Sequence, residues 1–460
     1  MSALPNTLYL PELREMLAEN NSAELEEFCT ALHPARTAEF MEGLSAAEAW
    51  AVLQHTDLDT RASIFGYFDR EKQLEIVQTG DRAEIGRLIA HLPADDRVDI
   101  LKEVPHEVVE QLLPLVPPLA RRDIIRLMAY REGTAGAMMT TSYARLREGL
   151  TVKKALEDLA QQAEHLETIY YVFVVDPEEH LRGVVSAQQM ISAIGKPNEL
   201  IDDLMERAVV SVDVTDDQEL VAQRVAKYDL HAIPVVDHEH HMLGIITHDD
   251  VIDVVAEEAN EDAYRMAAMG PMEENYLEAP FLDVWRKRSF WLLCLFVAQF
   301  LTFTAMTYFE GEMKKIFALM LFVPLVISAG GNSGSQAATL ITRAMALGHV
   351  TLRDWLRVLW HELLMGLALG VTLGLAGFVR GAVTSEHDLD KVNRWSMGIV
   401  VGLAVTGICL WGTIVGSMLP MFFKRLGFDP GYASTPFVAT LVDVTGIVIY
   451  FTIANVYLLP

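Results

Sequence analysis

The chain has 460 residues, with 36 Lys and Arg against 63 Asp and Glu and a formal net charge of −27, yet its mean hydropathy is positive, +0.23. Residues 281–460 hold 13 basic and 10 acidic residues, whereas residues 1–280 hold 23 basic and 53 acidic residues. This division excludes a single globular domain, and it argues against nucleic acid as a partner because phosphate would be repelled. It predicts an acidic soluble module joined to a membrane module, with a cation as the natural partner.

Neither the N-terminus nor the cysteines indicate export. The first residues, MSALPNTLYLPELREML, lack a basic segment followed by an apolar one, so no signal peptide is predicted. Cys29, Cys294 and Cys409 lie far apart and form neither a metal-type spacing nor a disulfide framework. We therefore expect the acidic half to lie in the cytoplasm.

Residues 1–132 carry no strand signal. Pro34, Pro93 and Pro105 each stand at the start of a segment with apolar residues at helical spacing, where a proline is tolerated. The pattern predicts an α-helical N-terminal domain over residues 1–132, in which short helical hairpins wind into a superhelix.

An internal repeat follows, with a constant spacing of 61 residues. Residues 174–176 (VVD) and 183–186 (GVVS) return as residues 235–237 (VVD) and 244–247 (GIIT). Each copy has the pattern of a strand, a hairpin turn, a second strand and a helix. The pattern predicts two α/β repeats, one over residues 133–200 and the other over residues 201–256.

These repeats resemble a tandem pair of cystathionine-β-synthase-type (CBS) domains, which implies a regulatory module that often binds adenine nucleotides such as ATP. The ribose-binding pattern of that family, Thr or Ser followed three residues later by Asp, is met by Thr247 and Asp250. In the first copy Ser186 is followed by Gln189 instead. At most one nucleotide site is therefore expected.

A strongly acidic segment joins the second repeat to the membrane half, and residues 257–280 are predicted as an acidic connecting helix. Helical spacing places Asp250, Asp253, Glu257 and Glu261 on one face, with Glu258 and Asp262 beside them. Like charges four residues apart destabilise a helix, so this face favours a bound cation. The alternative is a solvated acidic helix, but its place before the membrane half favours metal sensing.

Histidines cluster at positions 231, 238, 240, 241 and 248. Such a group is compatible with a Zn²⁺ or Ni²⁺ site. However, residues 238–241 occupy the predicted hairpin turn and no cysteine assists them, so a polar loop is the default interpretation.

The second half contains five apolar segments long enough to cross a bilayer, at 289–309, 316–340, 361–380, 396–420 and 433–458. Basic residues precede the first segment and lie between the second and third and between the fourth and fifth. This distribution predicts a multi-pass protein of the cell inner membrane with its N-terminal domains in the cytoplasm and its C-terminus outside.

Asp443 is the only carboxylate near the middle of a predicted span. An ionised carboxylate in hydrocarbon costs at least ~2.5–3.5 kcal/mol, so it normally faces a partner or water and marks an ion path. The alternative is a protonated Asp443 that hydrogen-bonds to Thr440 or Asn332. Glu362 stands near the start of the third span and is interpreted as an interfacial anchor.

The second span contains the sequence SAGGNSGSQAAT at residues 328–339. Pro324 and the glycines of this segment are expected to break the helix, and its polar side chains are expected to line a wet cavity. The alternative is close helix packing through small residues.

With this segment and DPGYASTPFVATLVDVTGIVIYF near the end, essentially the whole chain resembles the MgtE family of magnesium channels. The resemblance implies a homodimer with a pore on its two-fold axis and a carboxylate in the last span that binds hydrated Mg²⁺. The ion pathway predicted on this basis comprises Asp443, Thr440, Asn332 and Gly446. The implied cytosolic Mg²⁺ ligands are Asp95, Asp96, Asp229, Asp250, Asp253, Glu257, Glu258, Glu261 and Asp262.

The preferred function is therefore a Mg²⁺ channel that cytosolic Mg²⁺ closes. A carrier for Co²⁺, Zn²⁺ or Ca²⁺, an ion-coupled exchanger, and a membrane-anchored nucleotide sensor remain as alternatives. An isolated Asp443 suits Mg²⁺, which keeps most of its water and takes few carboxylates. No nucleophile–base pairing or phosphate-binding loop is found, so an enzyme is not expected.

Overall fold

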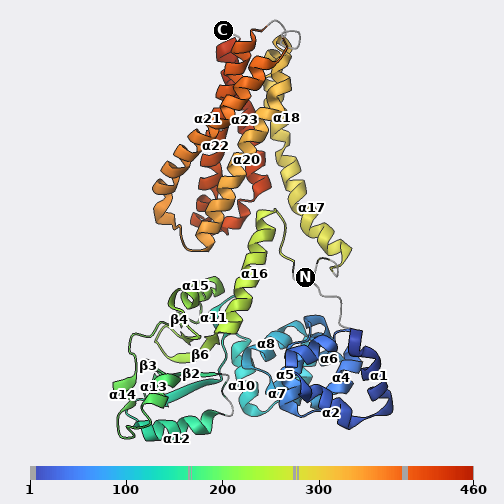
Figure 1. Cartoon of the computed structure of the whole chain (residues 1–460), viewed down its shortest axis with the longest axis vertical. Helices are drawn as coiled ribbons and strands as arrows, with labels where there is room; N and C mark the ends of the chain where they lie inside the picture. Colours follow the sequence, from blue (N-terminus) through green and yellow to red (C-terminus); the bar gives the residue numbers. More distant parts are fainter. Residues whose placement is uncertain are drawn as a thin grey trace. The chain divides into compact units, whose positions relative to one another are not determined.

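The chain divides into two units, Met1–Val255 and Ala256–Pro460. The computed structural model describes residues 7–163, 166, 168–272, 276, 279–385 and 392–458. Figure 1 shows both units, coloured along the sequence.

The first unit begins with short helices that follow one another in a stack (Figure 1, blue to cyan). They are the 3-10 helix η1 (Thr7–Tyr9), α1 (Leu10–Glu19), α2 (Ser22–Ala31), α3 (Pro34–Phe40), α4 (Ala46–Leu53), α5 (Leu58–Gly66), α6 (Arg70–Thr79), α7 (Arg82–His91), α8 (Ala94–Glu103), α9 (His106–Leu112), the 3-10 helix η2 (Leu113–Leu115) and α10 (Pro118–Leu127). Side chains cap several of them; Ser45 and Glu48 form a reciprocal capping box. Pro34 lies in the first turn of α3 as expected, whereas Pro93 and Pro105 occupy the preceding cap position.

Two α/β repeats complete the first unit. The first consists of α11 (Ala135–Met138), β1 (Tyr143–Arg147), α12 (Val152–Gln162), β2 (Thr168–Val175), β3 (Leu181–Ser186) and α13 (Ala187–Ser192). The second consists of α14 (Ile201–Leu204), β4 (Val212–Asp213), α15 (Gln218–Tyr228), β5 (Ala232–Val236), β6 (Met242–Thr247) and α16 (His248–Met266). Both sheets have a parallel pair followed by an antiparallel hairpin, in the orders β1-β2-β3 and β4-β5-β6.

The repeat predicted from the sequence is present in the strand register. Val174 pairs with Gly183 in the first sheet, and Val235 pairs with Gly244 in the second. Buried apolar side chains of the helical domain and of the second repeat belong to one cluster, which includes Leu127 and Val225. This shared core fixes the helical domain against the second repeat.

The acidic segment after the second repeat differs from its predicted bounds. A single helix, α16, begins at His248 inside the repeat and ends at Met266. The chain continues without helix through 267–272, and residues 273–275, 277 and 278 lie outside the described residues. All six acidic residues predicted to share adjacent faces of a helix, from Asp250 to Asp262, therefore belong to α16.

The second unit consists mainly of long apolar helices. They are α17 (Phe281–Ala298), α18 (Phe300–Tyr308), α19 (Glu310–Lys315), α20 (Ala318–Ala346), the 3-10 helix η4 (Leu352–Asp354), α21 (Trp355–Val383), α22 (Arg394–Arg425), the 3-10 helix η6 (Pro430–Tyr432) and α23 (Thr435–Leu458). Among the described residues, five segments are long and apolar enough to cross a membrane. Helix α22 packs against α20, α21 and α23, so it lies at the centre of this bundle.

The expected break in the second span is wrong, because α20 is continuous from Ala318 to Ala346 despite Pro324. Its glycines serve close packing instead. A Cβ atom at Gly416 of α22 would lie 2.0 Å from the carbonyl oxygen of Gly334, and a Cβ atom at Gly412 would lie 2.5 Å from that of Gly330. Only glycine permits this approach of two helix backbones.

Candidate cation sites

Asp443, the predicted pore carboxylate, lies half-buried on α23. Its Oδ1 would be 3.6 Å from a Cβ atom at Gly331, so the carboxylate faces the glycine-rich segment of α20. The side-chain amide of Gln299, at the junction of α17 and α18, hydrogen-bonds to the same carboxylate. Three helices of the bundle thus meet at this one acid.

The structure places the other predicted pathway residues differently. Thr440 donates its hydroxyl to the carbonyl oxygen of Pro436 at 2.8 Å, and the amide of Asn332 donates to Ser328 at 3.4 Å. Gly446 is buried against Ile408. No hydrogen bond between Asp443 and Thr440 or Asn332 is found among the described residues, so the geometry does not favour the alternative of a proton shared with either.

Two residues of the membrane helices differ from the sequence interpretation. Gln299 is the only carboxamide in an otherwise apolar first span, and that isolation was the available signal. Glu362 was interpreted as an interfacial anchor, but its residue is only 7% exposed, on the face of α21 that meets α22. The Thr413 hydroxyl of α22 lies 3.4 Å from the Glu362 backbone oxygen. The anchor interpretation is therefore wrong.

A first acidic cluster forms where the helical domain meets the second repeat. Asp96 of α8 lies close enough to Asp249 and Asp253 of α16 for their charges to act on it. Desolvation by the surrounding protein is the main cause that raises the pKa of Asp96, although the residue is exposed. The nearby charge of Arg70 lowers this pKa, and the charges of Asp249 and Asp253 raise it further. Burial, together with the charges of Asp249 and Asp96, raises the pKa of Asp250 to about 6. The cluster therefore resists carrying its full negative charge without a cation.

A second acidic cluster lies at the other end of α16, in the second unit. Arg265 forms ion pairs with Glu261 and with Asp429, which precedes η6. Burial and then the nearby charges of Asp429 and Glu258 raise the pKa of Asp262 to about 6. Glu261 and Asp429 thus pair with one guanidinium, Asp262 and Glu258 lie beside them, and Asp429 lies in the loop that leads into α23.

The remaining predicted ligands are more scattered. Asp95 is buried near Arg97, whereas Glu257 is exposed on α16. Asp229 ends α15 in the left-handed conformation, with φ of 51°. Asp95 and Asp229 contribute to neither acidic cluster through the contacts just described, and their roles stay predictions.

The predicted nucleotide-binding pair is already joined. The Thr247 hydroxyl donates to Asp250 Oδ2 at 2.6 Å, at the junction of β6 and α16. In the first repeat, Ser186 and Gln189 form a capping box instead, and they line an open cavity of about 670 Å³. The cavity therefore lies beside the repeat that lacks the Asp.

Comparisons with known proteins match most of the chain. Residues 323–453 match the MgtE divalent cation transporter family, residues 32–133 the MgtE intracellular N domain, and residues 135–196 and 201–257 CBS domains. The magnesium transporter MgtE of Thermus thermophilus is 35% identical over 449 residues, which cover 97% of this chain and 98% of the relative. The magnesium transporter MgtE of Enterococcus faecalis is 37% identical over 338 residues, covering 73% and 72%.

Among solved structures, the crystal structure of the soluble part of a magnesium transporter resembles this chain with a TM-score of 0.51 and 33% sequence identity. It covers 54% of this chain and 97% of that one. Five apolar spans, an intracellular helical domain and a CBS pair define a multi-pass membrane protein of the transporter class. Within that class, the chain belongs to the MgtE family.

The raised pKa of Asp250 predicts how stability depends on pH. The folded chain binds this proton more tightly than the unfolded chain, whose pKa is near 3.8, so the stability that the proton contributes is lost as pH rises towards about 6. In Mg²⁺-free buffer, Asp250→Asn should therefore raise thermal stability at about pH 7.5, by on the order of 1–3 kcal/mol, and have little effect at about pH 4. Thermal unfolding at both pH values measures this difference.

The matched control is Asp158→Asn, which removes one charge from an exposed position on α12. A gain in stability of the same size for Asp158→Asn would mean that overall charge, and not the acidic cluster, is responsible. An unchanged Asp250→Asn protein at neutral pH would contradict the electrostatic interpretation of this cluster.

Proposed function

We propose that this chain forms a homodimeric Mg²⁺ channel of the inner membrane, and that cytosolic Mg²⁺ closes it. The observation that carries the proposal is the meeting of three helices at the one carboxylate of α23, Asp443. Membership of a family whose relatives are named magnesium transporters supports the choice of ion. The basic residues at the span ends support a cytoplasmic N-terminal half and a C-terminus outside.

The chemistry of the pore residues fits a hydrated ion. Mg²⁺ sheds water reluctantly and is usually held by one or two carboxylates with several waters retained. One Asp443 from each subunit of a dimer would provide two carboxylates, and Gln299 would orient each of them. A dehydrating site for Ca²⁺ would instead need six to eight oxygen ligands.

The alternatives fit the observations less well. A membrane-anchored nucleotide sensor needs no carboxylate inside the bundle, and burying one costs free energy. A carrier for Co²⁺ or Zn²⁺ would favour imidazole or thiolate ligands, and neither type was predicted in the ion pathway. An enzyme is not proposed, because the relatives are transporters.

The first test concerns the pore. Asp443→Asn keeps the shape of the side chain but removes the charge that attracts a dication, so Mg²⁺ flux into liposomes should fall by at least about tenfold, because the lost attraction is worth more than 1.4 kcal/mol. Asp443→Glu should give an intermediate flux, because the added methylene displaces the carboxylate from its place beside Gly331.

Thermal unfolding in detergent should show that each variant remains folded. Glu362→Gln is the matched control, since it neutralises another buried carboxylate of the bundle, and its flux should stay close to that of the wild type. Wild-type flux in a folded Asp443→Asn protein would rule out Asp443 as the pore carboxylate. Flux measured for Co²⁺, Zn²⁺ and Ca²⁺ in the same liposomes would identify the ion.

The gate is proposed to be the two acidic clusters at the ends of α16. Without a cation, Asp96, Asp249 and Asp253 repel one another, and so do Glu258, Asp262 and Asp429. A divalent cation stabilises the state in which the carboxylates lie close together, by its differential affinity for the two states. Because Asp429 leads into α23, an ion held at the second cluster would act directly on the helix that bears Asp443.

The second test concerns this gate. Neutralising the second cluster with Glu258→Gln, Glu261→Gln and Asp262→Asn should abolish the inhibition of flux by cytosolic Mg²⁺ while flux itself persists. Each weak site contributes about 1–3 kcal/mol of coupling, so the wild-type response should be steep and the variant response flat. Flux recorded against cytosolic Mg²⁺ measures both.

A shortened chain that begins near Phe281 should also conduct without inhibition. If inhibition survives in the shortened chain, the sensor lies within the membrane helices, and the carboxylates of the first 280 residues serve another purpose. Glu310→Gln, on α19 of the second unit, is the control for the loss of an acidic charge.

We also propose that the CBS pair binds ATP through Thr247 and Asp250. A ligand at a hundredfold excess over its Kd stabilises the folded state by about 2.7 kcal/mol. ATP should therefore raise the thermal stability of the wild-type protein, and Asp250→Asn should remove that effect. No shift at millimolar ATP would contradict the site.

The comparison variant is Gln189→Ala, which alters the cavity beside Ser186 in the first repeat. An ATP effect that Gln189→Ala removes and Asp250→Asn leaves intact would assign the nucleotide to that cavity.

A further inference from the structure

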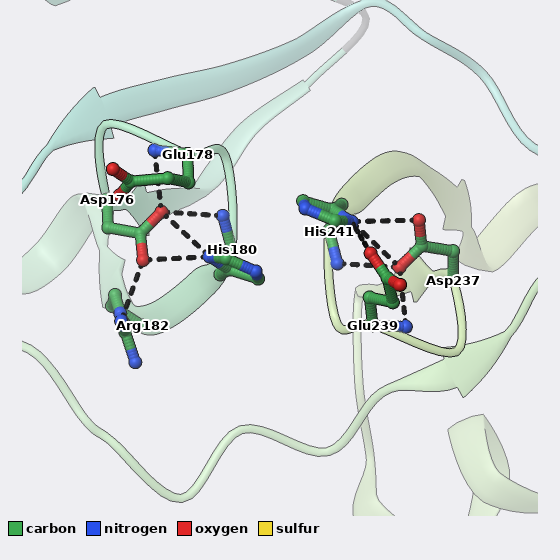
Figure 2. Close-up of polar contacts among 7 residues, drawn as sticks. All are labelled: Asp176, Glu178, His180, Arg182, Asp237, Glu239 and His241. Atoms are coloured by element: carbon green, nitrogen blue, oxygen red, sulfur yellow. Dashed lines mark hydrogen bonds and ion pairs between the residues drawn. The ribbon is translucent and has the colours of Figure 1, made fainter.

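The turns of the two β-hairpins carry the same pattern, Asp-x-Glu-x-His. In the first repeat these residues are Asp176, Glu178 and His180, and the corresponding residues 61 positions later are Asp237, Glu239 and His241. Figure 2 shows the two turns side by side. Leu181 N donates to His240 O at 3.0 Å, Met242 N donates to Glu179 O at 2.9 Å, and the rings of His180 and His241 stack with centroids 4.3 Å apart.

Each Asp organises its own turn in the same way. Asp176 Oδ1 accepts the backbone N–H groups of Glu178 and His180 at 3.0 and 2.8 Å, and Asp176 Oδ2 lies 3.0 Å from His180 Nδ1. Asp237 Oδ1 accepts the backbone N–H groups of Glu239 and His241, both at 2.9 Å, and Asp237 Oδ2 lies 2.9 Å from His241 Nδ1. These hydrogen bonds within the turn explain why Asp recurs at this position, but they do not explain why Glu and His recur with it.

The first turn brings three kinds of metal ligand together. One ligand atom from each of Asp176, Glu178 and His180 lies within 4.8 Å of the other two, and no other group of three or more His, Cys, Asp or Glu residues does so among the residues that the structure describes. Donor atoms about 2.0–2.2 Å from a tetrahedral Zn²⁺ ion lie roughly 3.3–3.6 Å apart. The exposed Glu178 side chain therefore needs to move only a short way for all three donor atoms to reach one ion.

The Asp176 carboxylate has one acceptor position left for a metal, because its other acceptor positions are already occupied by hydrogen bonds or an ion pair. An ionised carboxylate accepts about four hydrogen bonds. The two backbone N–H groups occupy Oδ1, Arg182 forms an ion pair with Oδ2 at 2.7 Å, and the fourth position faces His180 Nδ1.

We propose that Asp176, Glu178 and His180 bind a Zn²⁺-class transition-metal ion at the turn between β2 and β3. The His180 proton moves from Nδ1 to Nε2, and Nδ1 then ligates the ion together with one oxygen of Asp176 and one of Glu178, while water completes the coordination. Arg182 remains bonded to Asp176 and orients it, as outer partners of ligating carboxylates do. An imidazole ligand distinguishes this site from the all-oxygen acidic clusters of α16.

The second turn is a natural comparison for the first. Glu239 Oε2 lies 3.9 Å from His241 Nδ1, so this turn offers similar groups in a looser arrangement. Leu243 occupies the position that corresponds to Arg182, and among the described residues no guanidinium pairs with Asp237. Tighter binding is therefore expected at the first turn. Because the turns pair through their backbones, an ion at the first turn also stabilises the junction between the repeats.

The experiment titrates the full chain in detergent with Co²⁺ and then displaces Co²⁺ with Zn²⁺, with millimolar Mg²⁺ present throughout to occupy the oxygen sites. The visible absorption of Co²⁺ reports a nitrogen-containing site of low symmetry. His180→Gln and Glu178→Gln should each weaken Co²⁺ and Zn²⁺ binding by at least about tenfold, because even outer partners of metal sites contribute that much. Zn²⁺ should raise the thermal stability of the wild type and not that of either variant.

The controls are Glu179→Gln and His240→Gln. Glu179 lies in the same turn but pairs with Arg145 at 2.9 Å, and His240 is an exposed histidine of the second turn. Neither should alter binding. Glu178 is exposed, so Glu178→Gln tests the ligand set even if His180→Gln does not fold. The proposal is overturned if no ion binds in the presence of Mg²⁺, if Glu178→Gln binds as the wild type does, or if His240→Gln abolishes binding.

Discussion

Much of the chemistry of this chain depends on carboxylates that the fold crowds together with too few cations. In the first unit Asp96 faces Asp249 and Asp253, with Arg70 as the nearby cation. In the second unit Glu261 and Asp429 pair with Arg265, and Asp262 and Glu258 lie beside them. The unfolded chain separates these charges, so folding without a cation works against their repulsion. A divalent cation relieves the repulsion only while a cluster is assembled. A higher concentration of the cation therefore favours the folded state in which each cluster is assembled.

Helix α16 connects the elements that respond to that repulsion. Its first turn contains Asp250, which accepts the Thr247 hydroxyl, and its last turn contains Arg265, which holds Asp429 before α23. Because Asp250 accepts the Thr247 hydroxyl, any nucleotide at Thr247 would compete with cations for Asp250.

The sequence predicted those features whose signals are local. Five spans follow from runs of apolar residues, and the two α/β repeats follow from a constant spacing. The continuity of α20 was missed because glycines can either break a helix or allow two helices to pack closely. The contact of Gly334 with Gly416, which shows close packing, is visible only in the fold. Gln299 was missed although its isolation as the only carboxamide in the first span was a usable signal; its partner Asp443 lies far along the chain and is seen only in the fold. His180 could have been identified from the sequence, because the 61-residue repeat makes it the counterpart of His241.

The two kinds of proposed cation site differ in the metal ions that they can distinguish. The acidic clusters offer only oxygen, and oxygen ligands attract any small dication according to charge and geometry. Most borderline metals also bind carboxylates, so these clusters alone cannot separate Mg²⁺ from a scarcer transition metal. An imidazole beside two carboxylates binds Zn²⁺ far better than Mg²⁺. A turn such as that of His180 would therefore let the same folded unit respond separately to a transition metal while Mg²⁺ occupies the oxygen sites.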